Sequence, residues 1–343
     1  MTPYPVPKDF HVPVSDLRVV ASGLNRPECV LALDDGTLLT SHGAGGYSVI
    51  DSSGQVSHTL PAIPATRQHV PNGIALAPSG KVIFADLGAQ MGGLFSLSSS
   101  GNIEPVLTEV QGQALPPTNF LMVDELGVLW FTVSTTRVPR SLAWNHEVSD
   151  GFIGVMDADG ARIVADGLGY TNELAFSPNR RWLYVNETYA QRVSRFAVGG
   201  TTARPQLGVR ETVVQLGGAD LPDGLAFDIY GGLWVACIAS NRVLLVRPDG
   251  EVQTVISDTD PAHAERIAHG VAHACLQHVD MQTYGNSRLG NVSSIAFGGA
   301  RMSTAFLGCL LDDKIRAFQS PVPGLPLPHA RRRVATVRQP TLP

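Results

Sequence analysis

The stretch LPDGLAFDIYGGLWVA, residues 221–236, decides the fold of this chain. An apolar segment, a turn with two glycines and a second apolar segment predict two antiparallel strands joined by a tight turn. The first strand begins at Asp223, whose carboxylate would enter a buried sheet. Because an unpaired buried charge destabilises the folded state, Asp223 needs a partner from elsewhere in the chain.

Five other stretches repeat this pattern of a polar residue, a short apolar strand, a turn and a second strand. With the stretch above they read ECVLALDDG, NGIALAPSG, NFLMVDELG, NELAFSPNR, DGLAFDIYG and SSIAFGGAR, and they begin at residues 28, 72, 119, 172, 223 and 293. Most repeats continue into a third strand, a turn such as DADG or RPDG, and a fourth strand. Four strands at a spacing of about forty to fifty residues are typical of a β-propeller blade.

The repeats therefore predict an all-β fold, a six-bladed β-propeller with four-stranded blades that forms a single domain over residues 1–343. A doubly wound α/β fold is disfavoured because amphipathic helices are missing between the strands. The outer strand of the sixth blade should come from LRVVASG (17–23) or from RRRVATVR (331–338), because an open propeller would leave unpaired edges.

Two stretches interrupt the repeats, residues 134–151 and residues 257–291. We expect both to lie over one mouth of the channel, since long insertions in a compact domain are usually functional or disordered. The second, between the fifth and sixth blades, contains PAHAERIAHGVAHACLQ, which predicts a lid-like helix. Its His269 and His273 are spaced as zinc ligands can be, with Cys275 and His278 nearby, or they face solvent or substrate on the lid.

Composition restricts the function further. The net charge of −5 shows none of the basic excess of a nucleic-acid-binding protein. No apolar run is long enough to span a membrane, and the N-terminal residues do not resemble a secretory signal, so we expect a cytoplasmic protein. The four cysteines lie far apart, which predicts reduced thiols rather than disulfides. Oligomeric state is left open.

The polar residues that open the six repeats should converge at one height in the channel. They are Glu28, Asn72, Asn119, Asn172, Asp223 and Ser293. Such an oxygen-rich set with two carboxylates suits a hard divalent cation such as calcium or magnesium, which would also pair with Asp223. For Asn72 and Ser293 a capping or turn role explains the residue as well. Glu28 is a poor turn residue, which favours ligation.

At these positions the chain resembles the senescence-marker-protein/gluconolactonase family, which includes regucalcin and luciferin-regenerating enzymes. RPECVLALDDG, PPTNFLMVDELGVLWFT, YTNELAFSPNRRWLYVNE and LPDGLAFDIYGGLWVA carry the resemblance, which covers nearly the whole chain. It implies a six-bladed propeller with one divalent metal held by Glu28, Asn172 and Asp223. It also implies that Asn119 lies beside the metal and meets substrate, and Asn72 matches the PNG of the gluconolactonase branch.

The expected reaction is hydrolysis of a lactone or small ester by metal-activated water. Asp223 would accept a proton from water and Asn119 would donate a hydrogen bond to substrate, with Asn72 and His69 also binding substrate. His69 or His42 could act as an acid–base group. Calcium is the expected cation, with magnesium, manganese and zinc as alternatives. Alternative functions are a metal-dependent isomerase or lyase and a non-catalytic, metal-containing binding module.

The residue that follows Asn172 is also a carboxylic acid, Glu173. Because side chains alternate along a strand, we expect Glu173 to point to the opposite side from Asn172 and to have a structural role. Trp130, Trp182 and Trp234 occupy matching second strands and are expected to pack between blades.

Overall fold

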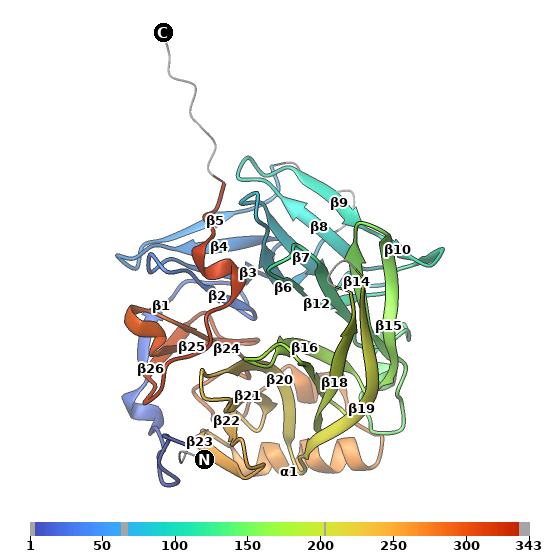
Figure 1. Ribbon diagram of the computed structural model, residues 1–343. Coiled ribbons are helices and arrows are strands. Elements are labelled where there is room, and N and C mark those ends of the chain that lie inside the picture. The colour runs from blue at the N-terminus through green and yellow to red at the C-terminus, as the bar shows by residue number, and fades with distance from the viewer. Residues whose placement is uncertain (1–3, 63–67, 202–203, 336–343) are drawn as a thin grey trace.

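The computed structural model describes residues 4–62, 68–201 and 204–335. It contains six four-stranded antiparallel sheets arranged around a central channel (Figure 1). The prediction of a six-bladed propeller with four-stranded blades is confirmed.

Five of the six blades run outward from the channel in chain order, and the sixth does so for its first three strands. The inner strands are β2 (Val30–Ala32), β6 (Pro71–Leu76), β12 (Thr118–Val123), β16 (Thr171–Phe176), β20 (Asp220–Phe227) and β24 (Val292–Gly298). The second strands are β3 (Leu38–His42), β7 (Val82–Asp86), β13 (Leu129–Val133), β17 (Trp182–Glu187), β21 (Leu233–Ala239) and β25 (Thr304–Cys309). The third strands are β4 (Gly46–Ile50), β8 (Gly93–Leu97), β14 (Gly151–Asp157), β18 (Arg192–Gly200), β22 (Arg242–Val246) and β26 (Ile315–Gln319).

The outer strands complete the sheets and close the ring. They are β5 (Val56–Thr59), β9 (Ile103–Leu107), β15 (Gly160–Leu168), β19 (Pro205–Gln215), β23 (Val252–Ser257) and, for the sixth blade, β1 (Arg18–Ala21). β1 pairs with β26, so the N-terminal candidate closes the propeller. The C-terminal candidate forms no strand over residues 331–335, and its residues 336–338 lie outside the described part of the chain. A short hairpin of β10 (Glu109–Val110) and β11 (Gln113–Ala114) leaves the second blade.

A β-bulge interrupts the inner strand of five blades where the polar residue of the repeat lies. Bulges break the alternation of side chains and are frequent next to active sites. In two blades glycine follows the polar residue because the next inner strand passes close by. A Cβ on Gly73 would lie 2.7 Å from Phe120 Cα, and one on Gly224 would lie 2.6 Å from Ser294 Cα. The sequences PNG and PDG thus reflect close strand packing and are not turns.

Two of the three tryptophans pack between blades as expected. Trp130 and Trp234 are buried, and their indole N–H groups donate to Asp124 and Asp228. Trp182 is only partly buried and stacks against Arg195, so its assignment to the core was wrong. It stands one position earlier in its repeat than the other two, and a shift of one residue moves a strand side chain to the other face.

The segment between β23 and β24 holds two α-helices, α1 (Pro261–Ala272) and α2 (His278–Met281). The Asp260 side chain caps α1, and proline occupies the first position of the helix. Ile267 and Val271 of α1 share an apolar cluster with Ala143 and Trp144, so the two insertions pack together at the same end of the propeller. No helix in the described ranges has both the length and the apolar content needed to cross a bilayer.

Candidate functional site

The six polar residues that open the repeats lie buried at one end of the channel, and we call them the polar ring. They are Glu28, Asn72, Asn119, Asn172, Asp223 and Ser293, and none is more than 4% exposed. Five of them lie at the bulges of their inner strands, and the sixth, Glu28, lies just before β2. The structure therefore brings together all the residues for which the sequence predicted metal binding.

Asn72 holds the first three blades together within the ring. Its amide nitrogen donates to Glu28 Oε1 and to Asn119 Oδ1, both at 2.8 Å. Its amide oxygen accepts from Arg26 Nη2 at 2.6 Å. Because both ends of the Asn72 side chain are engaged, this residue orients Glu28 and Asn119. Its predicted contact with substrate stays a prediction.

Asn172 is oriented by its neighbour Thr188. The Asn172 amide nitrogen donates to Thr188 Oγ1 at 3.0 Å, and that hydroxyl donates to the carbonyl of Pro222 at 2.8 Å. This chain fixes which end of the amide faces the channel and leaves Asn172 Oδ1 without a hydrogen-bond partner in the described structure. Thr188 was not singled out from the sequence, where it is one of many threonines.

Two buried oxygen atoms of the ring, Glu28 Oε2 and Asn172 Oδ1, have no hydrogen-bond partner among the residues that the structure describes. Such atoms are costly unless a ligand or ion satisfies them. With the Asp223 carboxylate beside them they form a set of oxygen donors that fits a hard divalent cation. No cluster of three or more His, Cys, Asp or Glu side chains occurs in the described ranges, so any cation held here uses two carboxylates and an amide.

The two carboxyl groups of the ring have perturbed proton affinities. Burial raises the pKa of Glu28 to about 7, although Arg26, the Asn72 hydrogen bond and Arg140 act in the opposite direction. Burial and then the charge of Glu28 raise the pKa of Asp223 well above its ordinary value. Like charges held close together in a dry site resist simultaneous ionisation, and a bound cation relieves this repulsion.

Two arginines border the ring, and sequence reasoning missed both. Ser134 Oγ accepts from Asn119 Nδ2 at 2.7 Å and from Arg140 Nη2 at 3.3 Å, which places the Arg140 guanidinium beside the ring. Arg140 Nε is buried without a hydrogen-bond partner in the described structure. Arg26 donates to Asn72 and to the carbonyl of Pro71. The only sequence signal was the place of Arg140 within the 134–151 insertion.

Glu173 lies on the channel wall, contrary to expectation. The bulge between Thr171 and Leu174 breaks the alternation that would have turned it away from Asn172. Its side chain is 7% exposed and accepts a hydrogen bond from the Leu225 backbone at 3.2 Å. Burial, Glu28 and Asp223 raise the pKa of Glu173 well above its ordinary value.

Comparison with known proteins shows the family of this chain. A family model described as the SMP-30/Gluconolactonase/LRE-like region matches residues 29–264. The chain belongs to this family. A 6-deoxy-6-sulfogluconolactonase of Pseudomonas putida is 32% identical over 164 residues, which are 47% of this chain and 53% of that protein. The match thus spans about half the length of this relative.

Solved structures of the family share the fold. A gluconolactonase from Xanthomonas campestris superposes with a TM-score of 0.64 at 20% identity, over 89% of each chain. A calcium-binding protein, regucalcin, from Agrobacterium tumefaciens gives a TM-score of 0.65 at 15% identity, over 95% of this chain and 99% of that chain. At these identities the likeness establishes the propeller architecture alone.

The two histidines considered as acid–base groups, His69 and His42, are not part of the polar ring. His69 Nδ1 lies 2.8 Å from Asp86 Oδ2, and its ring packs edge-on against Phe84 and Phe95. His42 accepts from the Ala44 backbone and packs against His58. No hydrogen bond among the described residues joins either histidine to Glu28, Asn172 or Asp223. Substrate binding by His69 stays a prediction.

The histidines of the lid segment do not gather with enough metal-binding side chains for a three-ligand site in the described ranges. His269 and His273 stack with ring centroids 4.2 Å apart, and Cys275 Sγ lies 3.8 Å from His269 Nδ1. His278 instead stacks on Trp144 of the other insertion. In the described part of the chain these groups supply no cluster of three metal-binding side chains, so the lid interpretation is favoured.

Proposed function

We propose that this protein is a lactonase that opens a small lactone with water and that it requires one divalent cation, with calcium as the expected ion. The observation that carries the proposal is a pair of oxygens, Glu28 Oε2 and Asn172 Oδ1, which are buried beside Asp223 and have no hydrogen-bond partner in the described part of the chain. Membership in a family with gluconolactonases supports the reaction class. The description of the regucalcin neighbour as calcium-binding supports the choice of ion.

A cation held by Glu28, Asn172 and Asp223 supplies Lewis acidity, which polarises a carbonyl and makes water more acidic. The chain's own residues supply the rest. Asp223 accepts a proton from the attacking water and returns it to the ring oxygen that leaves as the ester C–O bond breaks. The net reaction consumes one water and forms one hydroxy acid.

Asn119 and Arg140 are placed to orient the substrate. An amide nitrogen has two N–H groups, and the bond to Ser134 uses one of those on Asn119. The second can donate to the lactone. The unpartnered Nε of Arg140 can donate to the carbonyl oxygen as negative charge develops there, and a donor in this role commonly contributes a factor of about a hundred or more to turnover.

The decisive experiment combines a substrate panel with metal depletion. Purified protein is assayed against sugar lactones, simple aliphatic lactones and aryl esters, first in EDTA and then after addition of calcium, magnesium, manganese or zinc. We expect hydrolysis of at least one lactone to be lost in EDTA and restored by a divalent cation. Undiminished hydrolysis in EDTA would contradict the metal requirement.

Two variants test whether the activity depends on the polar ring. Asp223→Ala should abolish turnover and calcium binding together, with calcium binding measured by calorimetry. Asp220→Asn is the matched control, because Asp220 lies on the same strand but pairs with Arg242 outside the ring. Full turnover by the Asp223 variant, or equal losses in both variants, would overturn the assignment.

A further inference from the structure

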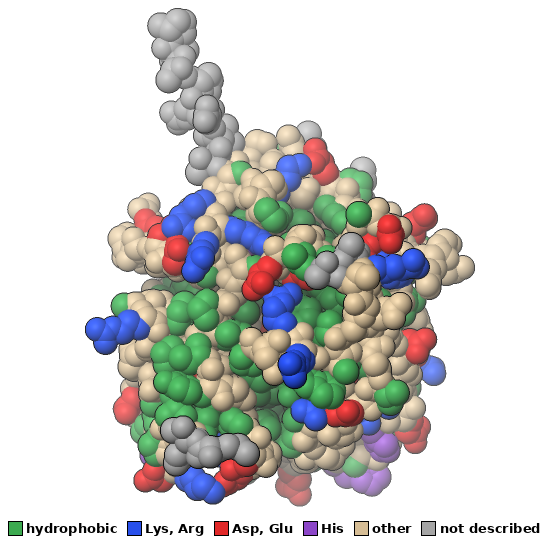
Figure 2. Space-filling view, in the orientation of Figure 1, with side chains coloured by type: hydrophobic (Ala, Val, Ile, Leu, Met, Phe, Trp, Pro, Cys, Tyr) green, Lys and Arg blue, Asp and Glu red, His purple; other side chains and the backbone are tan. Residues whose placement is uncertain are grey.

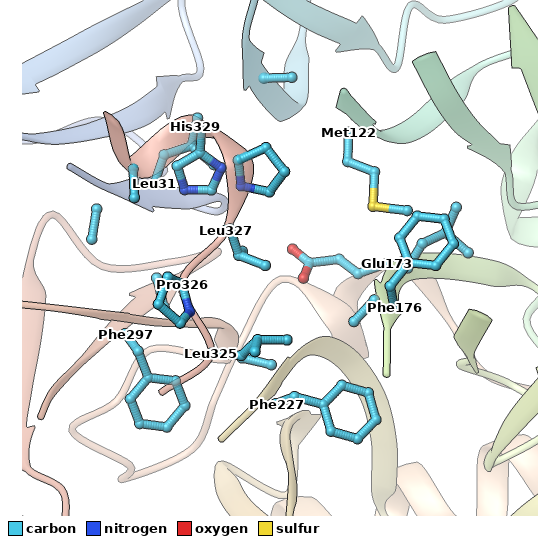
Figure 3. A pocket seen from close by; sticks show the side chains of 18 of the residues that line it. Leu31, Met122, Glu173, Phe176, Phe227, Phe297, Leu325, Pro326, Leu327 and His329 are labelled. Carbon is cyan, nitrogen blue, oxygen red and sulfur yellow. The ribbon is translucent and has the colours of Figure 1, made fainter. Parts of the chain in front are cut away.

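A separate cavity of about 160 Å³ occupies the half of the channel beyond the polar ring. All six inner strands contribute to its wall, through residues that follow the ring residues along each strand, and most of these are apolar. Figure 3 shows Leu31, Met122, Phe176 and Phe227 around this space. The cavity thus lies within the propeller and is distinct from the set of oxygen donors at the other end.

The chain's own C-terminal segment crosses the mouth of this cavity, and we call residues 325–335 the strap (Figures 1 and 3). The Leu325 backbone donates to the carbonyl of Phe227 at 2.8 Å, and the Asp34 backbone donates to the carbonyl of Ala330 at 2.8 Å. Arg333 pairs with Asp34 and Asp35. Figure 2 shows basic and acidic side chains interspersed on this face of the molecule.

One carboxyl group reaches the middle of the apolar space. Figure 3 shows the Glu173 side chain extending from β16 toward Leu327 of the strap. Glu173 is 7% exposed, and its one hydrogen bond in the described structure comes from the Leu225 backbone. A carboxyl group has more acceptor positions than this one bond uses, so Glu173 can accept a further hydrogen bond from a molecule in the cavity.

We propose that this cavity binds a small, uncharged aromatic or alicyclic molecule that carries one hydroxyl group, and that Glu173 accepts the hydrogen bond of that hydroxyl. The volume matches the ligand class, since a dry apolar cavity of about 150 Å³ holds benzene. Most of the wall is apolar, which disfavours ions and sugars because they would lose hydration with few replacement bonds. A carboxyl oxygen accepts from a hydroxyl whether or not the group is ionised.

Phenol and benzene are suitable probes, because they differ by the hydroxyl alone. Binding to the full chain is measured by calorimetry and ligand-observed NMR in the presence of EDTA, which separates this site from the metal site. We expect phenol to bind about five- to tenfold more tightly than benzene, the factor that one hydrogen bond contributes. If neither compound binds, the cavity holds water only and the proposal is wrong.

Three variants locate the site. Glu173→Leu should remove the preference for phenol and keep benzene binding, whereas Met122→Trp should fill the cavity and abolish both. Glu125→Gln is the control, because Glu125 lies at the rim of the same cavity but is 62% exposed and pairs with Arg180. Circular dichroism and thermal unfolding verify that each variant is folded. Retention of the phenol preference in a folded Glu173→Leu protein would overturn the proposal.

Discussion

Asn172 and Glu173 are adjacent in β16, yet Asn172 contributes to the polar ring while Glu173 extends into the apolar cavity beyond it. A regular strand would send the two side chains to opposite faces of the blade. The bulge between Thr171 and Leu174 brings both to the channel. One local irregularity therefore places neighbouring side chains in two chemically different spaces.

Thr188 is predicted to support metal binding without touching the metal. Its hydroxyl holds the Asn172 amide, so Thr188→Val should weaken calcium binding by about 10- to 100-fold, the usual loss when the partner of a metal ligand is removed. Thr40→Val is the matched control, because Thr40 is equally buried but its hydroxyl has no hydrogen-bond partner in the described structure. Calorimetric titration with calcium measures both, and equal affinities in the two variants would contradict the role of Thr188.

Calcium affinity should rise with pH. The pKa of Glu28 is about 7 and that of Asp223 is also raised, so a cation must displace protons in acidic solution. Each displaced proton lowers the apparent affinity about tenfold per pH unit below the pKa. Titrations from pH 5.5 to 8, in buffers of different ionisation enthalpy, measure the affinity and the protons released. Equal affinity at pH 6 and pH 8 would exclude this linkage.

Without a cation the same groups make stability depend on pH in the opposite sense. A raised pKa means that the folded state holds protons more tightly than the unfolded state. The contribution of Glu28 to the free energy of unfolding is therefore complete below its unfolded pKa near 4.5 and is lost as the pH rises through about 7. Urea denaturation in EDTA should show this decline, and added calcium should remove it.

Arg140→Ala is predicted to impair catalysis more than folding. Loss of the Nε donor and of the bond to Ser134 should lower kcat/KM by about 100-fold or more, because in the proposed mechanism both act on groups beside the substrate. Arg137→Ala, in the same insertion, removes an exposed arginine that pairs with Asp150 and should leave kcat/KM unchanged. Steady-state kinetics on the lactone identified by the substrate panel measure kcat/KM for both variants.

The strap should loosen in acid. Burial and the nearby charge of Arg332 lower the pKa of His329 to about 4, so the docked strap favours neutral histidine. This stabilisation is present above the unfolded pKa near 6.5 and is lost as the pH falls through about 4. Hydrogen exchange of the Leu325 and Ala335 amides, corrected for intrinsic rates, should accelerate over this interval. His329→Leu removes the titrating group and should abolish the effect.

The glycines after the ring residues are predicted to be packing positions. Gly73→Ala would place a Cβ against the Phe120 backbone and should lower the free energy of unfolding by about 1–3 kcal/mol. Gly217→Ala is the control, because a Cβ there meets nothing within 4 Å. Chemical denaturation measures both, and a neutral Gly73→Ala variant would show that the neighbouring strand can move away.

The sequence was sufficient for the architecture because the propeller repeats itself. Six copies of one strand–turn–strand pattern determine the number of blades, and the polar residue at the head of each copy identifies the ring. The repeat pattern gave the wrong side-chain direction only where a position was shifted by one residue relative to the other repeats or to regular alternation. Trp182 stands one position early in its repeat, and Glu173 lies in a bulge that no local sequence pattern predicted.

Contacts between distant segments were decided by tertiary structure alone. Arg26 and Arg140 reach the ring from segments between strands whose sequences carry no chemical motif. Thr188 contributes through hydrogen bonds to Asn172 and to the Pro222 carbonyl. The choice of β1 over the C-terminal segment for the last blade depended on which end of the chain could reach β26. The sequence thus determined the repeating unit, its polar ring residues and the family. Tertiary structure decided which side chains share the channel. Bulges and the close approach of neighbouring blades set the direction of side chains that the regular alternation along a strand does not predict.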